Sequence, residues 1–320
     1  MRITLAEVLQ QTRGKMVIDG SMSTGLELLG CTMKDSLWTA KILAEQPEKV
    51  KEVHLAYFRA GADCGITCSY QATIPGLMAH GFTRLEAEAV IVNSVRLFIE
   101  ARDQWWEQEG RAAGRAYPLC LGACGPYGAY LADGSEYRGH YGVLPEVLRQ
   151  FHQRRAELLW QAGADLLLFE TQPSLQEAMV EAELAETMGA DYWLSFSCQN
   201  GRLTNEGDLL TNCAKVLSRD HPHLRMLGVN CTPPRFIGEA ISSLTQATSL
   251  PIGVYPNSGE VYDAATKTWH GENEQQQNFG ALAGLWYQAG ASAVGGCCRT
   301  AASHIEQVAQ VRNQLVSQQK

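Results

Sequence analysis

The sequence contains neither a membrane-length apolar stretch nor a basic cluster. Its longest apolar runs, near residues 164–169 and 89–92, have the length of a strand, whereas a spanning helix needs roughly 18 to 20 apolar residues. The net charge is −8, and the longest run of basic residues is the pair Arg154-Arg155. We therefore expect no membrane insertion and no binding to nucleic acid or to anionic lipid.

A secretory signal and a disulfide framework are also missing. Residues 1–5, Met-Arg-Ile-Thr-Leu, lack a charged segment followed by an apolar core. Ten cysteines among 320 residues are too few for a disulfide scaffold. We expect a cytoplasmic protein with reduced thiols. Its length and its hydrophobic content of 45% suffice for one large α/β domain or two smaller ones.

What the sequence does contain is a pair of adjacent cysteines near its C-terminal end. Cys297 and Cys298 follow two glycines and the apolar run 291–294, and Cys231 ends a similar run that begins at residue 226. Three thiols thus lie at the ends of two expected strands. Three thiolates can hold one zinc ion and leave its fourth position open, which is the arrangement of a catalytic site.

The cysteine motif has other interpretations. Most cysteines in a cytosolic protein are small buried hydrophobes, and adjacent cysteines on a regular strand point to opposite faces. Cys297 and Cys298 can reach one metal only if the strand breaks, and Gly295 and Gly296 permit such a break. The spacing alone is as compatible with core packing or a vicinal disulfide as with a metal site.

A three-thiolate metal site would favour a particular chemistry. Thiolates make zinc electron-rich and a poorer activator of water than neutral imidazoles do. Such a zinc can still hold a substrate thiol as thiolate near pH 7, where a free thiol with a pKa of about 8.5 is mostly protonated. The motif, if it binds metal, therefore predicts a thiol substrate that attacks a second molecule.

One helix-to-strand junction recurs along the chain: a glycine ends a helical pattern and a strand-like run follows at once. The junctions lie at Gly61, Gly163, Gly189 and Gly290. Eight strand-like runs span residues 16–20, 64–69, 119–125, 166–170, 193–198, 226–231, 252–257 and 293–298. Helical patterns separate them, with expected capping boxes at Thr83 with Glu86 and at Ser174 with Glu177.

Eight alternating units in about 300 residues predict a single-domain (β/α)8 TIM-type barrel over residues 1–320. A doubly wound open sheet is the alternative, but Asp-Gly-Ser-Met-Ser at 19–23 is not a Gly-rich dinucleotide loop. The expected strand ends carry Asp19, Tyr70, Glu170, Cys231, Asn257, Cys297 and Cys298. Because active sites of this fold lie at strand ends, these residues predict a site there.

Two long loops follow the third strand (126–144) and the seventh (258–271). Loops longer than about 12 to 15 residues are usually functional or disordered. Their aromatic residues are Tyr127, Tyr130, Tyr137, Tyr141, Tyr262 and Trp269. We expect these loops to cover the mouth of the barrel, with ordinary packing beneath a loop as the alternative for each ring.

At this point the chain resembles the zinc-dependent homocysteine S-methyltransferases over nearly its whole length. The matching motifs are Ile-Asp-Gly at 18–20, Leu-Trp-Thr at 37–39, Ser-Tyr-Gln-Ala at 69–72, Phe-Glu-Thr at 169–171, Gly-Val-Asn-Cys at 228–231 and Gly-Gly-Cys-Cys-Arg at 295–299. The resemblance implies zinc held by Cys231, Cys297 and Cys298, with the sulfur of L-homocysteine as fourth ligand. Methylation of that sulfur would give methionine.

The resemblance also implies substrate-binding residues. They are Asp19, Gly20, Ser21, Met22, Glu170, Trp38, Tyr70 and Asn230. Asp19 and Glu170 match carboxylates that hold the substrate ammonium, and the backbone amides of residues 20–22 match the place where its carboxylate lies. Tyr70 matches a tyrosine that can approach the metal, and Trp38 an aromatic residue near the methyl donor.

The donor must carry a good leaving group, such as a sulfonium or a quaternary ammonium. Family members that use betaine have an aromatic residue directly after the glutamate that matches Glu170, whereas this chain has Thr171 and ends soon after the eighth helix. The resemblance therefore implies the short branch that uses S-methylmethionine, with S-adenosylmethionine as a second candidate donor. A betaine-dependent homocysteine methyltransferase is the alternative.

Other function classes remain open from the residues alone. A zinc-dependent barrel hydrolase or lyase would be expected to gather histidines, but none of the eight recurs at an expected strand end; they are at positions 54, 80, 140, 152, 221, 223, 270 and 304. A non-catalytic zinc or redox-sensor protein is the third class. For the assembly we expect a monomer or a small homo-oligomer.

Overall fold

The computed structural model of the protein describes residues 2–33, 35, 37–263, 268–270 and 278–318. Eight parallel strands form its central sheet: β1 (Met16–Val17), β2 (Cys64–Ile66), β3 (Leu119–Cys124), β4 (Leu166–Gln172), β5 (Tyr192–Phe196), β6 (Leu224–Asn230), β7 (Ile252–Tyr255) and β10 (Ala293–Val294). Each strand overlaps one of the eight runs expected from the sequence.

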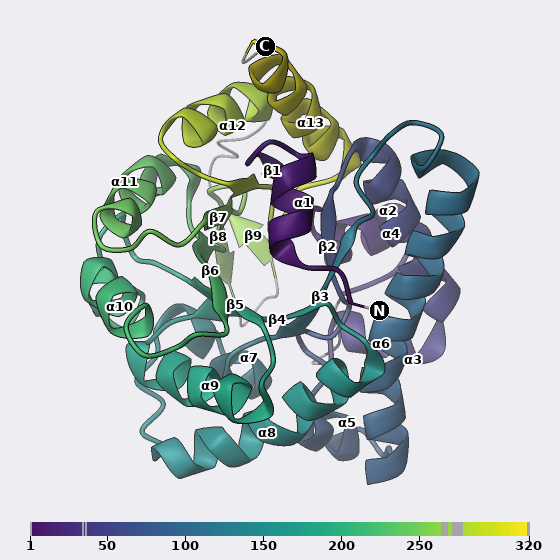
Figure 1. The fold of residues 1–320 in the computed structure, drawn as a ribbon. Coiled ribbons are helices and arrows are strands. Elements are labelled where there is room, and N and C mark those ends of the chain that lie inside the picture. Colours follow the sequence, from purple (N-terminus) through teal and green to yellow (C-terminus); the bar gives the residue numbers. More distant parts are fainter. Residues whose placement is uncertain (1, 34, 36, 264–267, 271–277, 319–320) are drawn as a thin grey trace.

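The sheet curls until its two edge strands meet. The strand order is β1-β10-β7-β6-β5-β4-β3-β2. An isolated parallel bridge joins Ile18, just after β1, to Cys64 of β2, and the Asp63 amide donates to the Val17 carbonyl at 2.8 Å. With helices surrounding the strands (Figure 1), the molecule is a nearly closed (β/α)8 barrel, which confirms the predicted fold class.

The helices lie outside the strands. They are α1 (Leu5–Gln11), α2 (Met22–Leu28), α3 (Thr39–Glu45), α4 (Pro47–Ala60), α5 (Ile74–Ala79), α6 (Arg84–Trp105), α7 (Tyr127–Leu131), α8 (Pro145–Ala162), α9 (Leu175–Met188), α10 (Leu210–Leu217), α11 (Pro234–Thr245), α12 (Phe279–Gln288) and α13 (Ala302–Ser317). Shorter elements are η1 (Trp106–Gly110), η2 (Ser135–Tyr137) and the antiparallel pair β8 (Val261–Asp263) and β9 (Thr268–His270). In the described part of the chain, none of the helices is both long enough and apolar enough to cross a bilayer.

Glycines end three of these helices at the predicted junctions. Gly61, Gly163 and Gly189 follow α4, α8 and α9 with φ angles of +114°, +108° and +60°. Glycine adopts this left-handed backbone without the steric cost that a Cβ brings. Gly290, with a φ of +116°, lies one residue past the C-cap of α12. The recurring junction is therefore a local turn that starts the next strand.

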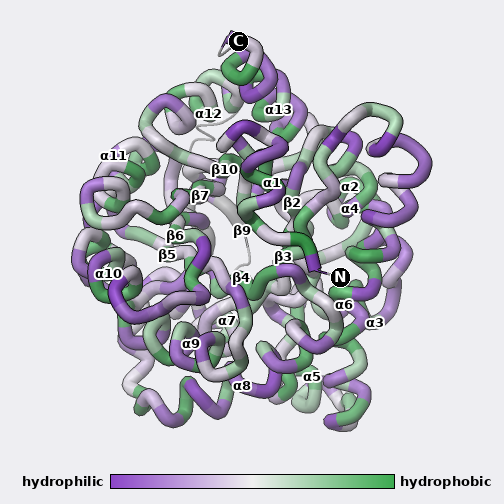
Figure 2. Tube along the Cα trace, in the orientation of Figure 1, coloured by the Kyte–Doolittle hydropathy of each residue, from purple (hydrophilic) through white to green (hydrophobic). Residues whose placement is uncertain are grey.

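Two buried layers stabilise the barrel. Side chains alternate along each strand, so Leu166 and Leu168 point into the barrel interior while Leu167 and Phe169 pack against the helices. Leu5 of α1 packs with the inner group, and Figure 1 looks onto the end of the barrel that α1 covers. In Figure 2, green hydrophobic residues follow β2 and β3, and purple hydrophilic residues recur around the outer helices.

Several strands end earlier than the sequence predicted: β2 ends at Ile66 and not at residue 69, and the same holds for β1 and β10. β1 ends at Val17 and β10 at Val294, several residues before positions 20 and 298. A Cβ on Gly295 would lie 2.6 Å from the Ile18 Cβ and 2.7 Å from the Ile18 carbonyl oxygen. Only glycine permits this close approach, and beyond it both chains leave the sheet to form the loops at the carboxyl end.

Candidate metal centre and active site

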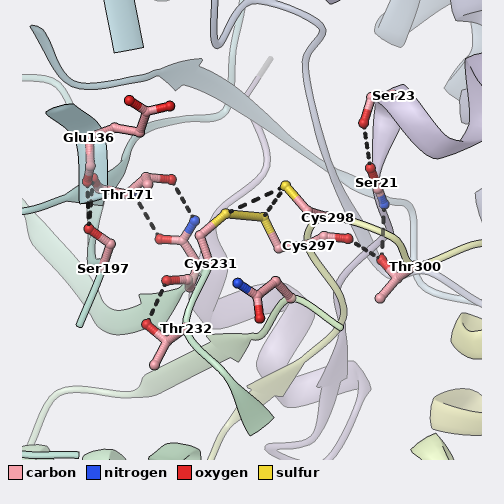
Figure 3. Close-up of a disulfide and its surroundings, with 12 residues drawn as sticks. Ser21, Ser23, Glu136, Thr171, Ser197, Cys231, Thr232, Cys297, Cys298 and Thr300 are labelled. Atoms are coloured by element: carbon pink, nitrogen blue, oxygen red, sulfur yellow. Dashed lines mark hydrogen bonds between the residues drawn. A yellow bond between two sulfur atoms is a disulfide. The ribbon is translucent and has the colours of Figure 1, made fainter. Parts of the chain in front are cut away.

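The three predicted metal-ligand cysteines meet at the carboxyl end of the barrel. Cys231 follows β6, and Cys297 and Cys298 follow β10. Their three Sγ atoms all lie within 4.8 Å of one another, and the Cys298 Sγ is 4.0 Å from each of the other two (Figure 3). The early end of β10 lets two adjacent cysteines face one point, as a shared site requires.

In this structure a disulfide joins Cys231 to Cys297 (Figure 3). The expectation that all ten cysteines are reduced thiols is therefore wrong for this pair, and the bond is not the vicinal 297–298 disulfide either. The eight other cysteines are free. The ends of β6 and β10 thus bring the two sulfurs together, and a shared metal ion would require this bond to be reduced and the sulfurs to separate to roughly 3.8 Å.

The donor set fits a zinc ion. Zinc bound by sulfur at about 2.3 Å in tetrahedral geometry places the sulfurs roughly 3.8 Å apart, close to the 4.0 Å separations of Cys298 from both partners. Burial, and then the nearby Glu170 carboxylate, raise the pKa of Cys298 to about 12. A thiolate at this position therefore needs a cation beside it, which a soft divalent metal supplies.

A cavity opens above the sulfurs, with about 1120 Å³ of space when its open mouth is included. The predicted site residues that line it are Gly20, Ser21, Met22, Trp38, Tyr70, Glu170, Cys231, Cys297 and Cys298. Asp19 and Asn230 are not part of its lining; both are buried beside lining residues in the chain.

Asp19 and Glu170 form an acidic pair beneath the cavity. Burial raises the pKa of Glu170 to about 8, although the nearby Tyr255 side chain opposes the shift. Burial and then the charge of Glu170 raise the pKa of Asp19 well above its usual value, against a hydrogen bond from the Ile66 amide (2.9 Å). The Asp19 Oδ1 has no hydrogen-bond partner among the described residues. A cation between the two carboxylates would stabilise the charged form of both.

The Asn230 side chain, at the end of β6, hydrogen-bonds Thr171 of β4, which lies on the far side of β5 in the sheet. Its Oδ1 accepts a hydrogen bond from the Thr171 amide and its Nδ2 donates to the Thr171 Oγ1, both at 2.8 Å. Thr171 lies in β4 with a φ of +61°, a conformation that is uncommon for residues other than glycine. The Asn230 side chain therefore holds the residue that follows Glu170 and lines the cavity.

Gly20 and Ser21 lie where the chain crosses from β1 to α2. A Cβ on Gly20 would lie 2.7 Å from the Tyr57 ring, so the backbone approaches that ring as only glycine can. The Ser21 amide already donates to the Thr300 carbonyl and hydroxyl, both at 3.2 Å. A substrate carboxylate is thus left with the amides at the start of α2, those of Met22 and Ser23, which have no partner within the helix.

Tyr70 and Trp38 stand together on one wall of the cavity. Their ring centroids are 6.3 Å apart in an edge-to-face arrangement. Burial and the carboxylates of Glu136 and Glu170 raise the pKa of Tyr70 well above its usual value, so its hydroxyl stays protonated at neutral pH. Trp38 has a φ of +50° at the N-cap of α3.

The loop after β3 covers part of the mouth, as predicted. Tyr137 of η2 lines the cavity, whereas Tyr127 packs against Tyr130 and Tyr141 at ring-centroid distances of 5.8 and 5.7 Å. Packing under the loop therefore accounts for most of the aromatic residues that we expected there. In the loop after β7, the side chains predicted to act as a cover lie outside the described residues; they are Tyr262 and Trp269.

A second group of metal-type side chains, not foreseen from the sequence, lies behind the loops. His152 of α8 contacts Glu177 at 2.7 Å and Glu181 at 3.3 Å, and all three are fully buried. Arg155 lies beside them and donates to the carbonyls of Gly125 (2.6 Å) and Tyr70 (3.3 Å). Because the Arg155 guanidinium, positioned beside these side chains, bonds the backbone after β2 and β3, and the Glu177 carboxylate accepts from the Tyr127 amide, we assign the group to holding these loops.

The sequence signal for this network is the helical spacing of its members. His152 and Arg155 are three apart on α8, and Glu177 and Glu181 are four apart on α9, so each pair lies on one helix face. Of the two hydrogen bonds in the capping box predicted at Ser174, only one forms. The Ser174 hydroxyl accepts from the Glu177 amide, but the Glu177 carboxylate accepts from the Tyr127 amide instead of returning to the cap.

Comparisons with known proteins agree with this site. The family model described as homocysteine S-methyltransferase matches residues 16–312. Homocysteine S-methyltransferase YbgG of Bacillus subtilis is 46% identical, covering 92% of this chain and 93% of that protein. Homocysteine S-methyltransferase of Escherichia coli is 43% identical, covering 91% and 93%.

Solved structures similar to this chain also belong to a homocysteine methyltransferase. Crystal structures of the homocysteine methyltransferase MmuM from Escherichia coli match in a metallated form (TM-score 0.82) and an oxidized form (TM-score 0.83), each 39% identical. The metallated form covers 93% of this chain and 96% of that chain, and the oxidized form covers 94% and 97%. Given these matches, this chain belongs to the homocysteine S-methyltransferase family and is a methyltransferase.

Proposed function

We propose that the protein transfers a methyl group from S-methylmethionine to the thiolate of L-homocysteine, at a zinc ion held by Cys231, Cys297 and Cys298. The observation that carries this proposal is the meeting of the three sulfurs within 4.8 Å under a cavity. When bound there, zinc would supply the positive charge that keeps a substrate thiol deprotonated at neutral pH.

The acidic pair and the start of α2 would orient homocysteine. Asp19 and Glu170 hold its ammonium, because both carboxylates are buried and the Asp19 Oδ1 has no partner among the described residues. The amides at the start of α2 receive its carboxylate. A thiol fixed at one end and an amino-acid group fixed at the other leave the sulfur a single direction of attack.

The donor would enter above the sulfur, between the aromatic walls. The homocysteine sulfur forms a bond to the methyl carbon while the S–CH₃ bond of the sulfonium breaks. The electron pair of the broken bond stays on the donor sulfur, which leaves as a neutral thioether, so both products are methionine. The ring face of Trp38, which lines the cavity, would stabilise the sulfonium by roughly 0.5–2 kcal/mol.

S-Adenosylmethionine is a second candidate donor, because it carries the same sulfonium group. Betaine is disfavoured at Thr171, which lines the cavity where betaine users have an aromatic residue. Family membership sets aside the hydrolase or lyase and the redox-sensor alternatives. Because zinc binding requires reduced cysteines, we also propose a cytoplasmic location, with the chain acting as a monomer or a small homo-oligomer.

The test is methionine formation by the purified, reduced, zinc-loaded protein. Homocysteine is supplied with S-methylmethionine, S-adenosylmethionine or betaine at equal concentration. We expect the fastest turnover with S-methylmethionine and little with betaine, and we expect chelation of the metal to stop the reaction. Faster turnover with betaine would refute the donor assignment, and full turnover by the metal-free protein would refute the metal site.

A further inference from the structure

The cavity has more carboxyl groups than homocysteine needs. Its described lining includes the carboxylates of Asp35, Glu136 and Glu170, and no lysine, arginine or histidine. Asp35 is already paired, with Lys41 at 3.0 Å and His80 at 3.5 Å. Glu170 belongs with Asp19 beneath the sulfurs. Glu136 is therefore the lining carboxylate to which no partner has been assigned.

The loop after β3 fixes the backbone of Glu136. The Ser197 hydroxyl donates to the Glu136 carbonyl at 3.2 Å, and the Tyr137 amide donates to the Gly134 carbonyl at 3.1 Å. A Cβ on Gly128 would lie 2.5 Å from the Glu136 nitrogen, so α7 packs directly on η2. A glutamate on so well-anchored a turn presents its carboxylate in a defined place.

The carboxylate itself has an unsatisfied oxygen. The Glu136 Oε2 is buried and has no hydrogen-bond partner among the described residues, and in Figure 3 the side chain points away from Ser197 with no hydrogen bond to the residues drawn. Burial raises its pKa to about 7; the Asp133 charge adds to the shift and the Arg138 charge opposes it. The Arg138 guanidinium contacts Asp133 and Ser135 and its side chain is 65% exposed. A buried carboxylate without a partner is costly unless a cation joins it.

Glu136 and Glu170 differ in which side chains of the site their charges affect most. The charge of Glu170 affects the Cys298 thiol more than that of Glu136 does, whereas Glu136 has the larger effect on Tyr70. Both carboxylates line the same cavity and come from different elements, Glu170 from β4 and Glu136 from η2. Two amino-acid substrates that react with each other bring two ammonium groups.

We propose that Glu136 binds the α-ammonium of the methyl donor and thereby selects amino-acid sulfonium donors over other sulfonium ions. This inference rests on the proposed function. The ammonium is the expected partner because its charge persists throughout the reaction, so a carboxylate beside it stabilises the bound donor and the transition state equally. A carboxylate beside the sulfonium would stabilise a charge that disappears as the methyl group leaves, and would slow the transfer.

The experiment compares two donors in the wild type and in Glu136→Gln. One is S-methylmethionine, and the other is dimethylsulfoniopropionate, a sulfonium without an ammonium, measured as a substrate or as a competitive inhibitor. For Glu136→Gln we expect the KM of S-methylmethionine to rise at least tenfold, with kcat changed less than threefold and the homocysteine KM unchanged. The KM or inhibition constant of dimethylsulfoniopropionate should stay within twofold of its wild-type value.

Two further variants complete the design. Glu136→Asp keeps the charge on a shorter side chain and should recover part of the donor affinity, which a merely structural role would not predict. Glu146→Gln removes the same charge from the exposed first turn of α8 and should change neither constant.

Three results for Glu136→Gln would overturn the inference. The first is an unchanged KM for S-methylmethionine, and the second is an equally large rise in the constant for dimethylsulfoniopropionate. The third is a rise in the homocysteine KM alone. If the wild type itself fails to methylate homocysteine with S-methylmethionine, the proposed function fails first and the inference with it. Failure of the variants alone leaves the proposed function standing.

Discussion

Residues around the cavity hold backbone conformations that side chains other than glycine rarely adopt. Trp38, Thr171 and Cys231 line the cavity with φ angles of +50°, +61° and +46°, and Arg299, which follows Cys298, has +69°. Each such conformation costs on the order of 1–3 kcal/mol and persists only when its surroundings enforce it. Asn230 does so for Thr171 through two hydrogen bonds. The strained positions cluster where the chemistry is proposed.

The roles of the site residues were harder to predict than their positions. The motif around Cys231 pointed to the three sulfurs that meet in the structure and that we propose as metal ligands, because a thiol carries its chemistry in its own side chain. The role of Asn230 depends on a neighbour 59 positions away, which no local pattern records. Glu136 was missed for the same reason: its unpaired oxygen results from how α7 and η2 pack, not from its sequence context.

Replacing Glu170 by glutamine tests the homocysteine site. The substitution removes a buried charge next to Asp19 but keeps the shape of the side chain. We expect homocysteine binding to weaken by about 1.5–3 kcal/mol, the usual value of a hydrogen bond to a charged group, with zinc content unchanged. Titration of homocysteine into the zinc-loaded variant measures the loss, with Glu146→Gln as the surface control. Wild-type affinity would show that Glu170 has a purely structural role.

At the scale of elements, the repeated junction does more than turn the chain. At three of the four junctions an aspartate lies two residues after the glycine, and in two of them its carboxylate bonds the backbone of the neighbouring strand. The Asp165 Oδ2 accepts from the Cys120 amide at 2.9 Å and from Arg102 at 2.6 Å. Asp63 repeats the pattern with the Val17 amide and Arg312. The junction was predictable from glycine and apolar periodicity, but the arginine partners come from distant helices and were not.

Substituting Asp165 by alanine should therefore destabilise the barrel strongly. It leaves Arg102, whose side chain is 7% exposed, as an uncompensated buried charge. Breaking such a pair usually costs about 3–5 kcal/mol, while Asp220→Ala, in an exposed pair, should cost less than about 0.5 kcal/mol. Urea unfolding measures both. Because Asp165 lies at the amino-terminal end of its strand, the folded variant should keep wild-type KM values, and a changed KM would contradict this separation of roles.

The contact between α4 and α6 predicts a pH dependence of stability. His54 is fully buried between Phe58 and Phe98, and neither ring nitrogen has a hydrogen-bond partner among the described residues. Burial lowers its pKa to about 3, below the value of about 6.5 in an unfolded chain. At this side chain the folded state therefore binds fewer protons, so the contribution of His54 to stability is constant above about pH 6.5 and falls by about 1.4 kcal/mol per pH unit from there towards pH 3.

His54→Phe should remove this component. Between pH 7 and pH 5 the variant should lose about 2 kcal/mol less unfolding free energy than the wild type does. Denaturant titrations at the two pH values provide the numbers, with His140→Phe, at a side chain that is 72% exposed, as the control. An identical pH dependence in His54→Phe and the wild type would mean that His54 is not a buried neutral base.

At the scale of the whole molecule, the two ends of the barrel differ. The amino-terminal end is covered by α1 and bound together by buried ion pairs of Asp63 and Asp165. The carboxyl end combines strained backbone, an open cavity and carboxylate oxygens that have no hydrogen-bond partner among the described residues. Stability and function are thus separated along the barrel axis, as is usual in this fold.

The architecture was the most predictable level. Eight apolar runs and their glycine junctions were sufficient to predict the barrel, because periodicity reflects which faces are buried. Strand ends were less predictable: β10 stops at Val294 because Gly295 lies against Ile18, a contact between the two ends of the chain. The Cys231–Cys297 disulfide was likewise not predicted, since thiol spacing does not distinguish an S–S bond from a shared metal ion.

The central claim is that Cys231, Cys297 and Cys298 hold a zinc ion whose fourth position receives the homocysteine sulfur. X-ray absorption at the zinc edge, on the reduced protein loaded with one zinc per chain, counts the sulfur neighbours directly. We predict three sulfurs at about 2.3 Å from the zinc ion without substrate and four after L-homocysteine is added. A count that stays at three, or a shell dominated by nitrogen and oxygen, would contradict it.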